Sequence, residues 1–266
     1  MARSKNSPMS REHRIRFGES LIWGIHPILE VLQTQPQRLV EVCVQKDKQS
    51  KALQEIIDSA RNHKIKCLFV DKIKITESQE PLNHQGVVAK CAPVPLLPFD
   101  DLLKFFQEAS RQGANPRLMA CDSIQDPHNL GAIIRSAHAA GVSHLILTRD
   151  RSAPLAGTAA KASAGAIAKV HISQVTNLAE ALKKVKEAGG WIFGAIKDEQ
   201  AQSIYQTDFN VPACLVVGNE GSGLRPLVKR HCDLLVSIPM AGEIDSLNSS
   251  VAAAVILFEM HRQSLD

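Results

Sequence analysis

Apolar residues recur along the first third of this chain in short runs whose spacing switches between helical and strand-like. The expected elements are a helix after Pro27, a strand over 38–45, a helix over 52–60, and strands over 65–70 and 87–91. Within the strand over 38–45, simple alternation places Val40, Val42 and Val44 on one face. The pattern from 17 to 92 therefore predicts a small α/β domain.

A different pattern begins after residue 99, following a proline-rich segment. Pro93, Pro95 and Pro98 fix the backbone there, which predicts a semi-rigid linker over 93–99. Beyond it, short apolar runs alternate with longer amphipathic ones. The expected strands cover 118–121, 144–148, 169–172, 191–196, 213–217 and 234–238, and the expected helices cover 100–111, 129–140, 158–164, 178–188 and 249–261. This alternation predicts an α/β domain over 100–266 with a mainly parallel sheet covered on both faces.

Composition narrows the class of protein. Of 266 residues, 44% are hydrophobic, and no apolar run approaches the roughly 20 residues that a membrane helix needs. The N-terminus lacks an apolar secretory core, so we expect a cytoplasmic protein without membrane contact. Six cysteines are scattered without a CxxC pair, which favours reduced thiols and argues against a metal site.

The net charge of +4 is concentrated at the N-terminus. Residues 1–16 carry five basic side chains and one acidic side chain, so the remaining chain is balanced. We interpret 1–16 as a basic disordered tail. Such a tail is either a non-specific phosphate contact for RNA or a solvated terminus.

Three polar segments interrupt the second pattern where strands end. The strand over 213–217 runs into Gly218, Glu220, Gly221 and Gly223, and glycine lets a backbone turn sharply beside a ligand. The other segments are DSIQDPHNLGAIIRSA over 122–137 and IPMAGEIDSLNSS over 238–250. In open α/β sheets, ligands bind beyond the carboxyl ends of the strands, so these segments are the candidate site.

Together, the three segments resemble the motifs of the SpoU/TrmH-type RNA ribose 2'-O-methyltransferases of the SPOUT superfamily. They match DxxxDPxNxGxxxRxA, VxGxEGxGL and IPMxGxxxSLNxS in the same order. The resemblance is nearest to the subgroup that methylates a guanosine in bacterial 23S rRNA. It implies an N-terminal domain like ribosomal protein L30, which binds the RNA substrate, and a C-terminal domain with a trefoil knot. It also implies S-adenosylmethionine as cofactor and a homodimer.

The resemblance implies roles for particular residues. The cofactor-binding residues would be Val217, Gly218, Asn219, Ile238, Met240, Ser246 and Leu247. The catalytic residues would be Asn129, Arg135, Glu220 and Asn248. The residues alone favour a core position for Ile238 and Leu247 and a helix-capping role for Asn248, and only their place in the motifs indicates a role in the site.

The chemistry of methyl transfer constrains Arg135. A ribose hydroxyl must be aligned with the methyl carbon and must lose its proton. Because arginine stays protonated in proteins, we expect Arg135 to hold the phosphate beside the target and to stabilise the developing alkoxide. The proton would leave to a neighbouring phosphate, to water or to Glu220.

Alternative functions remain at this point. A transfer-RNA guanosine 2'-O-methyltransferase and an rRNA methyltransferase that confers antibiotic resistance share the motifs. A non-catalytic RNA-binding protein is disfavoured because Asn129, Arg135, Glu220 and Asn248 are all present. A nucleotide-dependent oxidoreductase is disfavoured because no GxGxxG follows an early strand.

Overall fold

The described part of the chain contains three sheets, of seven, four and two strands. The structure is a computed structural model that describes the chain except residues 1–11, 17–20, 77–81, 199–200, 243–245 and 266. The chain divides into two compact units, 1–93 and 94–266. The division falls inside the proline-rich segment.

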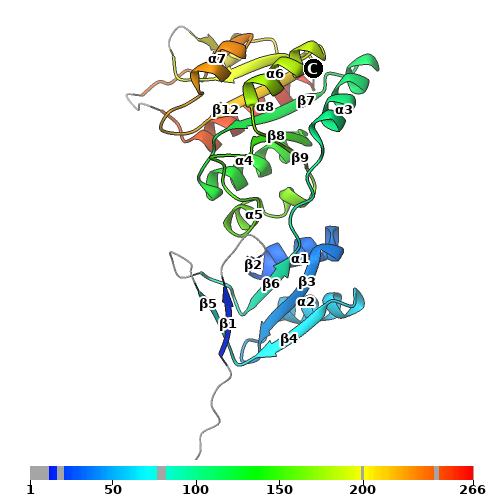
Figure 1. Cartoon of the computed structure of the whole chain (residues 1–266). Coiled ribbons are helices and arrows are strands. Elements are labelled where there is room, and N and C mark those ends of the chain that lie inside the picture. Colours follow the sequence, from blue (N-terminus) through cyan, green and yellow to red (C-terminus); the bar gives the residue numbers. More distant parts are fainter. Residues whose placement is uncertain (1–11, 17–20, 77–81, 199–200, 243–245, 266) are drawn as a thin grey trace, which may run out of the picture. The chain divides into compact units, whose positions relative to one another are not determined.

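The N-terminal unit is built on a four-stranded sheet in the order β2-β6-β3-β4. Its strands are β2 (Leu21–Trp23), β3 (Leu39–Gln45), β4 (Lys66–Val70) and β6 (Val87–Cys91). The pair β3–β4 is parallel, and the other two pairs are antiparallel. The helices are α1 (Ile25–Thr34) and α2 (Lys51–Asn62), and α2 makes the crossover between β3 and β4 (Figure 1). A 3-10 turn, η1 (Pro36–Arg38), precedes β3.

Two details of this unit differ from the sequence-based predictions. First, part of the predicted disordered tail is a strand: β1 (Glu12–Arg16) pairs in parallel with β5 (Lys72–Thr76), which the apolar pattern did not reveal. The rest of the tail, 1–11, lies outside the described residues. Second, Val40 does not share a face with Val42 and Val44. The register shifts between Leu39 and Glu41, and this bulge leaves Val40 55% exposed.

The C-terminal unit holds a seven-stranded sheet in the order β11-β13-β10-β12-β7-β8-β9, and every pair is parallel. The strands are β7 (Arg117–Asp122), β8 (His144–Thr148), β9 (His171–Val175), β10 (Trp191–Ala195), β11 (Gln202–Ser203), β12 (Ala213–Gly218) and β13 (Leu234–Ser237). The helices are α3 (Phe99–Arg111), α4 (Pro127–Ala139), α5 (Thr158–Ala162), α6 (Leu178–Glu187), α7 (Pro226–His231) and α8 (Ser249–Gln263), with 3-10 turns η2 (Ala166–Ala168) and η3 (Ile204–Gln206).

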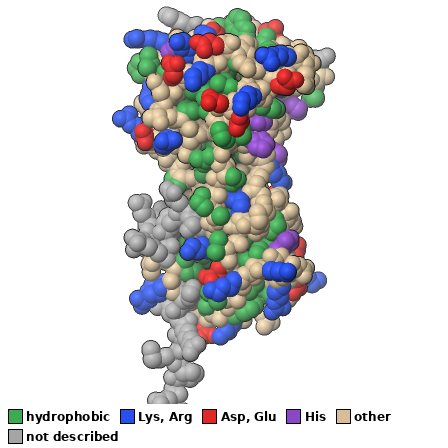
Figure 2. Space-filling view, turned by 45° about the vertical axis from the view of Figure 1, so that its right-hand side comes forward, with side chains coloured by type: hydrophobic (Ala, Val, Ile, Leu, Met, Phe, Trp, Pro, Cys, Tyr) green, Lys and Arg blue, Asp and Glu red, His purple; other side chains and the backbone are tan. Residues whose placement is uncertain are grey.

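Helices cover both faces of this sheet, which confirms the predicted parallel architecture (Figure 1). Alternate residues of β7 show how the core divides. Met119 and Cys121 pack with α4 and α8, whereas Leu118 and Ala120 pack with α3 and α6. A strand buried on both faces reads as a continuous apolar run, as the sequence of β7 does. On the face shown in Figure 2, acidic and basic side chains are interspersed over this unit.

The predicted linker is partly a component of the C-terminal unit. The Leu97 N–H donates to the Ile172 carbonyl at 2.8 Å, and the Ser173 hydroxyl donates to the Leu97 carbonyl at 2.8 Å. The prediction missed α7 and β11 and began β9 two residues early. The trefoil knot stays a prediction.

Two further findings concern the chain as a whole. Across the described residues, no helix is long and apolar enough to cross a membrane. All six cysteines are free, and four of them are buried.

Candidate active site

The three polar segments meet at one edge of the C-terminal sheet. Strands β7 and β12 are parallel neighbours, and their last residues, Asp122 and Gly218, are paired in register. The loop after β7 leads into α4, and the loop after β12 carries Glu220. The third segment contains Asn248, the residue that caps α8. Since parallel strands end at the same edge, segments distant in sequence converge there.

Three predicted catalytic side chains form one hydrogen-bonded group, which we name the amide–carboxylate cluster: Asn129, Glu220 and Asn248. The Asn129 amide donates to Glu220 Oε1 at 2.5 Å, and the Asn248 amide donates to the same oxygen. The Asn248 amide also donates to Asn129 Oδ1 at 3.0 Å. Glu220 thus accepts two hydrogen bonds and stays exposed at the rim.

Helix caps orient the two asparagines. Asp126 caps α4 by accepting from the His128 N–H at 2.8 Å, and its second oxygen accepts from the Asn129 amide at 3.1 Å. Asn248 caps α8 by accepting from the Ser250 N–H at 2.9 Å. The cap and the catalytic interpretations of Asn248 are therefore compatible, because its oxygen serves the cap and its amide serves the cluster.

The loop that presents Glu220 is tightly closed. The Gly223 N–H donates to the Asn219 carbonyl at 2.8 Å, and Gly223 lies in the left-handed region with φ of 63°. A side chain at Gly218 would place its Cβ 2.2 Å from the Gly223 carbonyl carbon and oxygen. Gly218 is therefore needed for the loop to fold back on its own strand.

An ion pair anchors the far end of the same loop. The Asp122 carboxylate, fully buried, accepts from the Arg225 Nε–H at 2.6 Å and from the Arg225 N–H at 2.9 Å. This pair joins the end of β7 to the start of α7. Asp122 begins the first motif segment, but no sequence pattern singled out Arg225, which lies 103 residues away along the chain.

Arg135 stands apart from the cluster. It lies two turns along α4 from Asn129, on a different side of the helix, and its side chain is exposed. Within the described residues, it takes no part in the hydrogen bonds that join Asn129, Glu220 and Asn248. The structure thus unites three of the four predicted catalytic residues and leaves Arg135 free to meet a ligand from solvent.

The predicted cofactor-binding residues lie around the same edge. Val217 and Gly218 are buried at the end of β12, and Asn219 follows, with its amide donating to the Ser123 carbonyl at 3.3 Å. Ile238 and Met240 follow β13, while Ser246 and Leu247 precede the cap of α8. Strands β12 and β13 flank β10, so their ends stand about 10 Å apart.

Two further findings concern the thiol and the possible metal ligands of the C-terminal unit. Burial raises the pKa of the Cys121 thiol, near the end of β7, to about 12, so it is not a thiolate nucleophile. Among the described residues, no group of three histidine, cysteine, aspartate or glutamate side chains is arranged to hold a metal ion.

Comparison with known proteins places these features in context. Residues 116–258 match the model of the SpoU rRNA Methylase family, and residues 21–97 match that of the RNA 2'-O ribose methyltransferase substrate binding domain. The chain is 40% identical to the 23S rRNA (guanosine-2'-O-)-methyltransferase RlmB of Pasteurella multocida, over 92% of this chain and 98% of the relative. It is also 40% identical to the Haemophilus influenzae protein of that name, with the same coverage.

Solved structures show the same fold. The SpoU methyltransferase AviRb from Streptomyces viridochromogenes superposes with a TM-score of 0.70 at 26% identity, covering 92% of this chain and 89% of that chain. The A. aeolicus TrmH/SpoU tRNA modifying enzyme superposes with a TM-score of 0.52 at 28% identity, covering 63% of this chain and 84% of that chain.

Proposed function

The chain belongs to the SpoU rRNA methylase family, and we propose that it methylates the ribose 2'-hydroxyl of a guanosine in 23S ribosomal RNA, using S-adenosylmethionine. The observation that carries this proposal is the amide–carboxylate cluster. Asn129 and Asn248, from two motif segments, both donate to one carboxylate oxygen of Glu220, which belongs to the segment that follows β12. Near-full-length similarity to 23S rRNA guanosine-2'-O-methyltransferases supports the choice of substrate.

The residues at the sheet edge fit the cofactor. An adenosine needs an apolar slot and nearby backbone donors and acceptors. Ile238 and Leu247 are half-buried, and Gly218, which has no room for a side chain, ends β12 at the carboxyl edge of the same sheet. Val217, Asn219, Met240 and Ser246 complete the set that we propose to bind it. When bound, S-adenosylmethionine supplies an electrophilic methyl group whose leaving thioether is neutral.

The protein's own residues then act on the ribose. We propose that the amides of Asn129 and Asn248 hold Glu220 in one orientation, so that its free oxygen can accept a hydrogen bond from the 2'-hydroxyl and take up its proton. Arg135, cationic and exposed, binds the adjacent phosphate and stabilises the developing alkoxide. A preorganised carboxylate needs no rearrangement as the oxygen attacks.

Mapping ribose methylation tests this function. A 2'-O-methyl group protects the bond 3' of its nucleotide from alkaline cleavage. This protection is compared, nucleotide by nucleotide, in ribosomal and transfer RNA from cells with and without the gene. We expect one guanosine of 23S rRNA to lose its protection when the gene is deleted, and purified protein with S-adenosylmethionine to restore it. Loss of protection in transfer RNA alone would replace the proposed substrate with transfer RNA.

We further propose that the protein acts as a homodimer in the cytoplasm, where its rRNA substrate is made. Val251 and Phe258, seven residues apart on α8, fall on one helical face, and each is nearly half exposed. Burying this apolar stripe against a second copy would remove it from water. Sedimentation of the wild type and of Phe258→Asp measures this: the wild type should sediment as a dimer and the variant as a monomer.

A further inference from the structure

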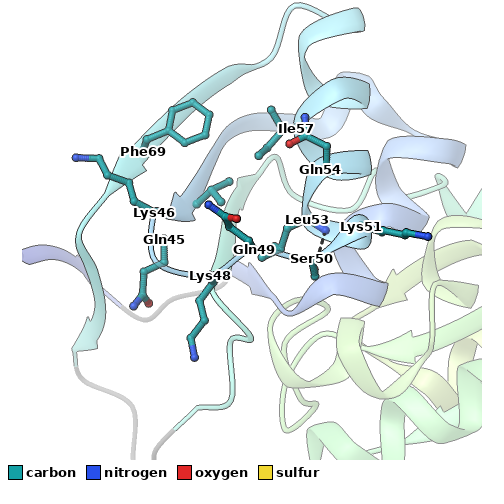
Figure 3. Close-up of a pocket in the computed structure, with 11 residues that line it drawn as sticks. Gln45, Lys46, Lys48, Gln49, Ser50, Lys51, Leu53, Gln54, Ile57 and Phe69 are labelled. Atoms are coloured by element: carbon teal, nitrogen blue, oxygen red, sulfur yellow. Dashed lines mark hydrogen bonds between the residues drawn. The ribbon is translucent and has the colours of Figure 1, made fainter.

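A cavity of about 600 Å³ lies in the N-terminal unit (Figure 3). It is lined by residues from the end of β3, the loop that follows, the first turns of α2 and one position of β4: Val44, Gln45, Lys46, Lys48, Gln49, Ser50, Lys51, Leu53, Gln54, Ile57 and Phe69. In the parallel pair β3–β4, Val44 is in register with Phe69. The cavity thus sits where a β-α-β unit typically places a ligand, at the carboxyl ends of its strands.

The lining combines three kinds of side chain. Its floor is apolar, with Val44 and Leu53 buried. Its rim carries three lysines and three glutamines, and none of the described residues that line it is a carboxylate. Lysine bonds to phosphate oxygens, and a side-chain amide both donates and accepts, as the edges of nucleobases require.

Phe69 supplies an aromatic surface at this cavity. Its side chain is 42% exposed, although aromatic residues make up only 4% of the chain. Figure 3 shows it on the strand side, with Gln54 and Ile57 on the helix side and Gln49 between them. An exposed ring beside lysines is the arrangement with which proteins stack an unpaired base and hold its backbone.

Some lining groups already have partners. Ser50 caps α2 by accepting from the Leu53 N–H at 3.1 Å, and Lys46 pairs with Asp71 at 2.9 Å. Gln54 donates to Asp58 at 2.9 Å. Among the described residues that line the cavity, Phe69, Gln49 and Lys48, like Gln45 and Lys51, take part in none of these side-chain contacts and can meet a ligand.

We propose that this cavity binds one unpaired nucleotide of the RNA substrate, with its base stacked on Phe69, its edge facing Gln49 and its phosphate bound by Lys48. This inference rests on the proposed function, because it takes the ligand to be the RNA that the enzyme methylates. It adds a specific recognition site within the N-terminal unit, separate from the residues that react.

Two variants with matched controls test the site in the full-length protein. Phe69→Leu keeps an apolar side chain and removes the ring, Phe69→Tyr restores a ring, and Lys48→Met keeps the stem and removes the charge. Lys90→Met, an exposed lysine of β6 that does not line the cavity, is the control for charge. Affinity for an unmodified 23S rRNA transcript is measured by filter binding at several salt concentrations, and melting temperature reports folding.

We expect Phe69→Leu to weaken binding about five- to a hundred-fold and Phe69→Tyr to bind like wild type. Lys48→Met should lower the salt slope by about 1, since one phosphate contact is lost. The KM for RNA should rise in Phe69→Leu while kcat at saturating RNA stays. Ultraviolet crosslinking of the wild type should attach RNA to Phe69.

The outcomes separate this site from the proposed function. Methylation of the same transcript is measured in the same samples. Suppose that Phe69→Leu and Lys48→Met bind and crosslink the transcript as the wild type does, and still methylate it. This result would overturn the nucleotide site and leave the enzyme function standing. A wild type that binds the transcript through Phe69 without methylating it would overturn the function and leave the site.

Discussion

The two units present polar residues at the carboxyl ends of parallel strands in opposite ways. In the amide–carboxylate cluster, Asn129, Glu220 and Asn248 hydrogen-bond to one another, and the loop between Gly218 and Gly223 is closed without spare room. At the cavity lined by Phe69, long exposed side chains surround an apolar floor. The first arrangement is suited to fixing a reacting group, and the second to adapting to a flexible ligand.

The two sites also differ in how far apart their residues lie along the sequence. The cluster joins residues 91 and 119 positions apart in sequence, so only the folded sheet creates it. The cavity comes mostly from the single stretch 44–57 together with Phe69. We therefore expect substitutions in the amide–carboxylate cluster to slow catalysis and substitutions in the cavity to weaken RNA binding.

The largest effect should come from removing the charge of the cluster. Glu220→Gln keeps an oxygen that can accept from both asparagines but loses the carboxylate that we propose takes up the proton. We expect kcat to fall by about 10² to 10⁴-fold, with affinity for rRNA within about twofold of wild type, the reverse of the Phe69→Leu result. Single-turnover methyl transfer and filter binding measure the two quantities.

The matched control is Glu187→Gln, an exposed glutamate on α6 away from the cluster. This variant should keep the wild-type kcat and the wild-type affinity for rRNA. If Glu220→Gln weakened RNA binding as much as it slowed methyl transfer, the cluster would be a binding element, and the division between the units would fail.

Arg135 tests whether the C-terminal unit also contributes binding charge. Because one charge-assisted hydrogen bond contributes about 1.5–3 kcal/mol, Arg135→Ala should lower kcat/KM by about ten- to a hundred-fold. If the cation alone matters, Arg135→Lys should retain activity within about tenfold of wild type.

Arg230→Ala, an exposed arginine on α7, serves as control and should retain wild-type kcat/KM. A loss in Arg135→Lys equal to that in Arg135→Ala would show instead that the planar guanidinium is required.

The closed loop after β12 predicts a sharp contrast between two glycines. In Gly218→Ala, the new Cβ would meet backbone atoms of Gly223 and Leu224 within 2.5 Å, and backbone cannot rotate away. We expect the free energy of unfolding of the C-terminal unit to fall by about 3 kcal/mol, the upper range for overpacking.

In Gly221→Ala, by contrast, the nearest atom is Asn219 Oδ1 at 3.5 Å, an ordinary contact. Its free energy of unfolding, measured by urea denaturation, should stay within about 0.5 kcal/mol of wild type. Equal destabilisation by both substitutions would mean that the loop is not held closed by Gly218.

Sequence alone predicted the C-terminal unit better than the N-terminal unit, for a physical reason. Strands such as β7 and β12 are buried on both faces and read as apolar runs, and α4 begins at Pro127 behind its Asp126 cap. In the N-terminal unit, β1 contains a single apolar residue, Ile15, and β5 has two isoleucines separated by a lysine, so no strong apolar run marked these strands. The bulge at Val40 likewise depends on pairing with β6.

The candidate site was predictable only as far as motifs reach. They named Asn129, Glu220 and Asn248, but not the bonds that the cap residues Asp126 and Asn248 add to the cluster. Arg225, which anchors the loop to Asp122, belongs to no motif. Phe69 and Lys48 also lacked a signal, because their common cavity exists only once β4 lies beside β3.

The smallest effect concerns stability of the C-terminal unit at low pH. His144 on β8 is buried, stacks on Phe105 at a ring-centroid distance of 3.8 Å, and lies near His171. Burial, with a smaller contribution from the charge of His171, lowers the pKa of His144 from 6.5 to about 4. The folded protein therefore resists protonation of this ring between pH 6.5 and pH 4, whereas the unfolded chain accepts the proton.

Because only the unfolded chain accepts this proton readily, lowering the pH destabilises the folded protein. The contribution of neutral His144 to the free energy of unfolding is fully present above pH 6.5 and is lost as the pH falls toward 4. At pH 5 the loss is about 2 kcal/mol. In His144→Phe, urea denaturation should show this loss removed, so the variant's stability should fall less between pH 7 and pH 5. His63→Asn, which replaces an exposed histidine of the N-terminal unit, should keep the wild-type slope. If the free energy of unfolding fell equally with pH in the wild type and in His144→Phe, the ring would be protonated within the folded protein. This part of the C-terminal unit would then be as open to water as the rim of the cavity.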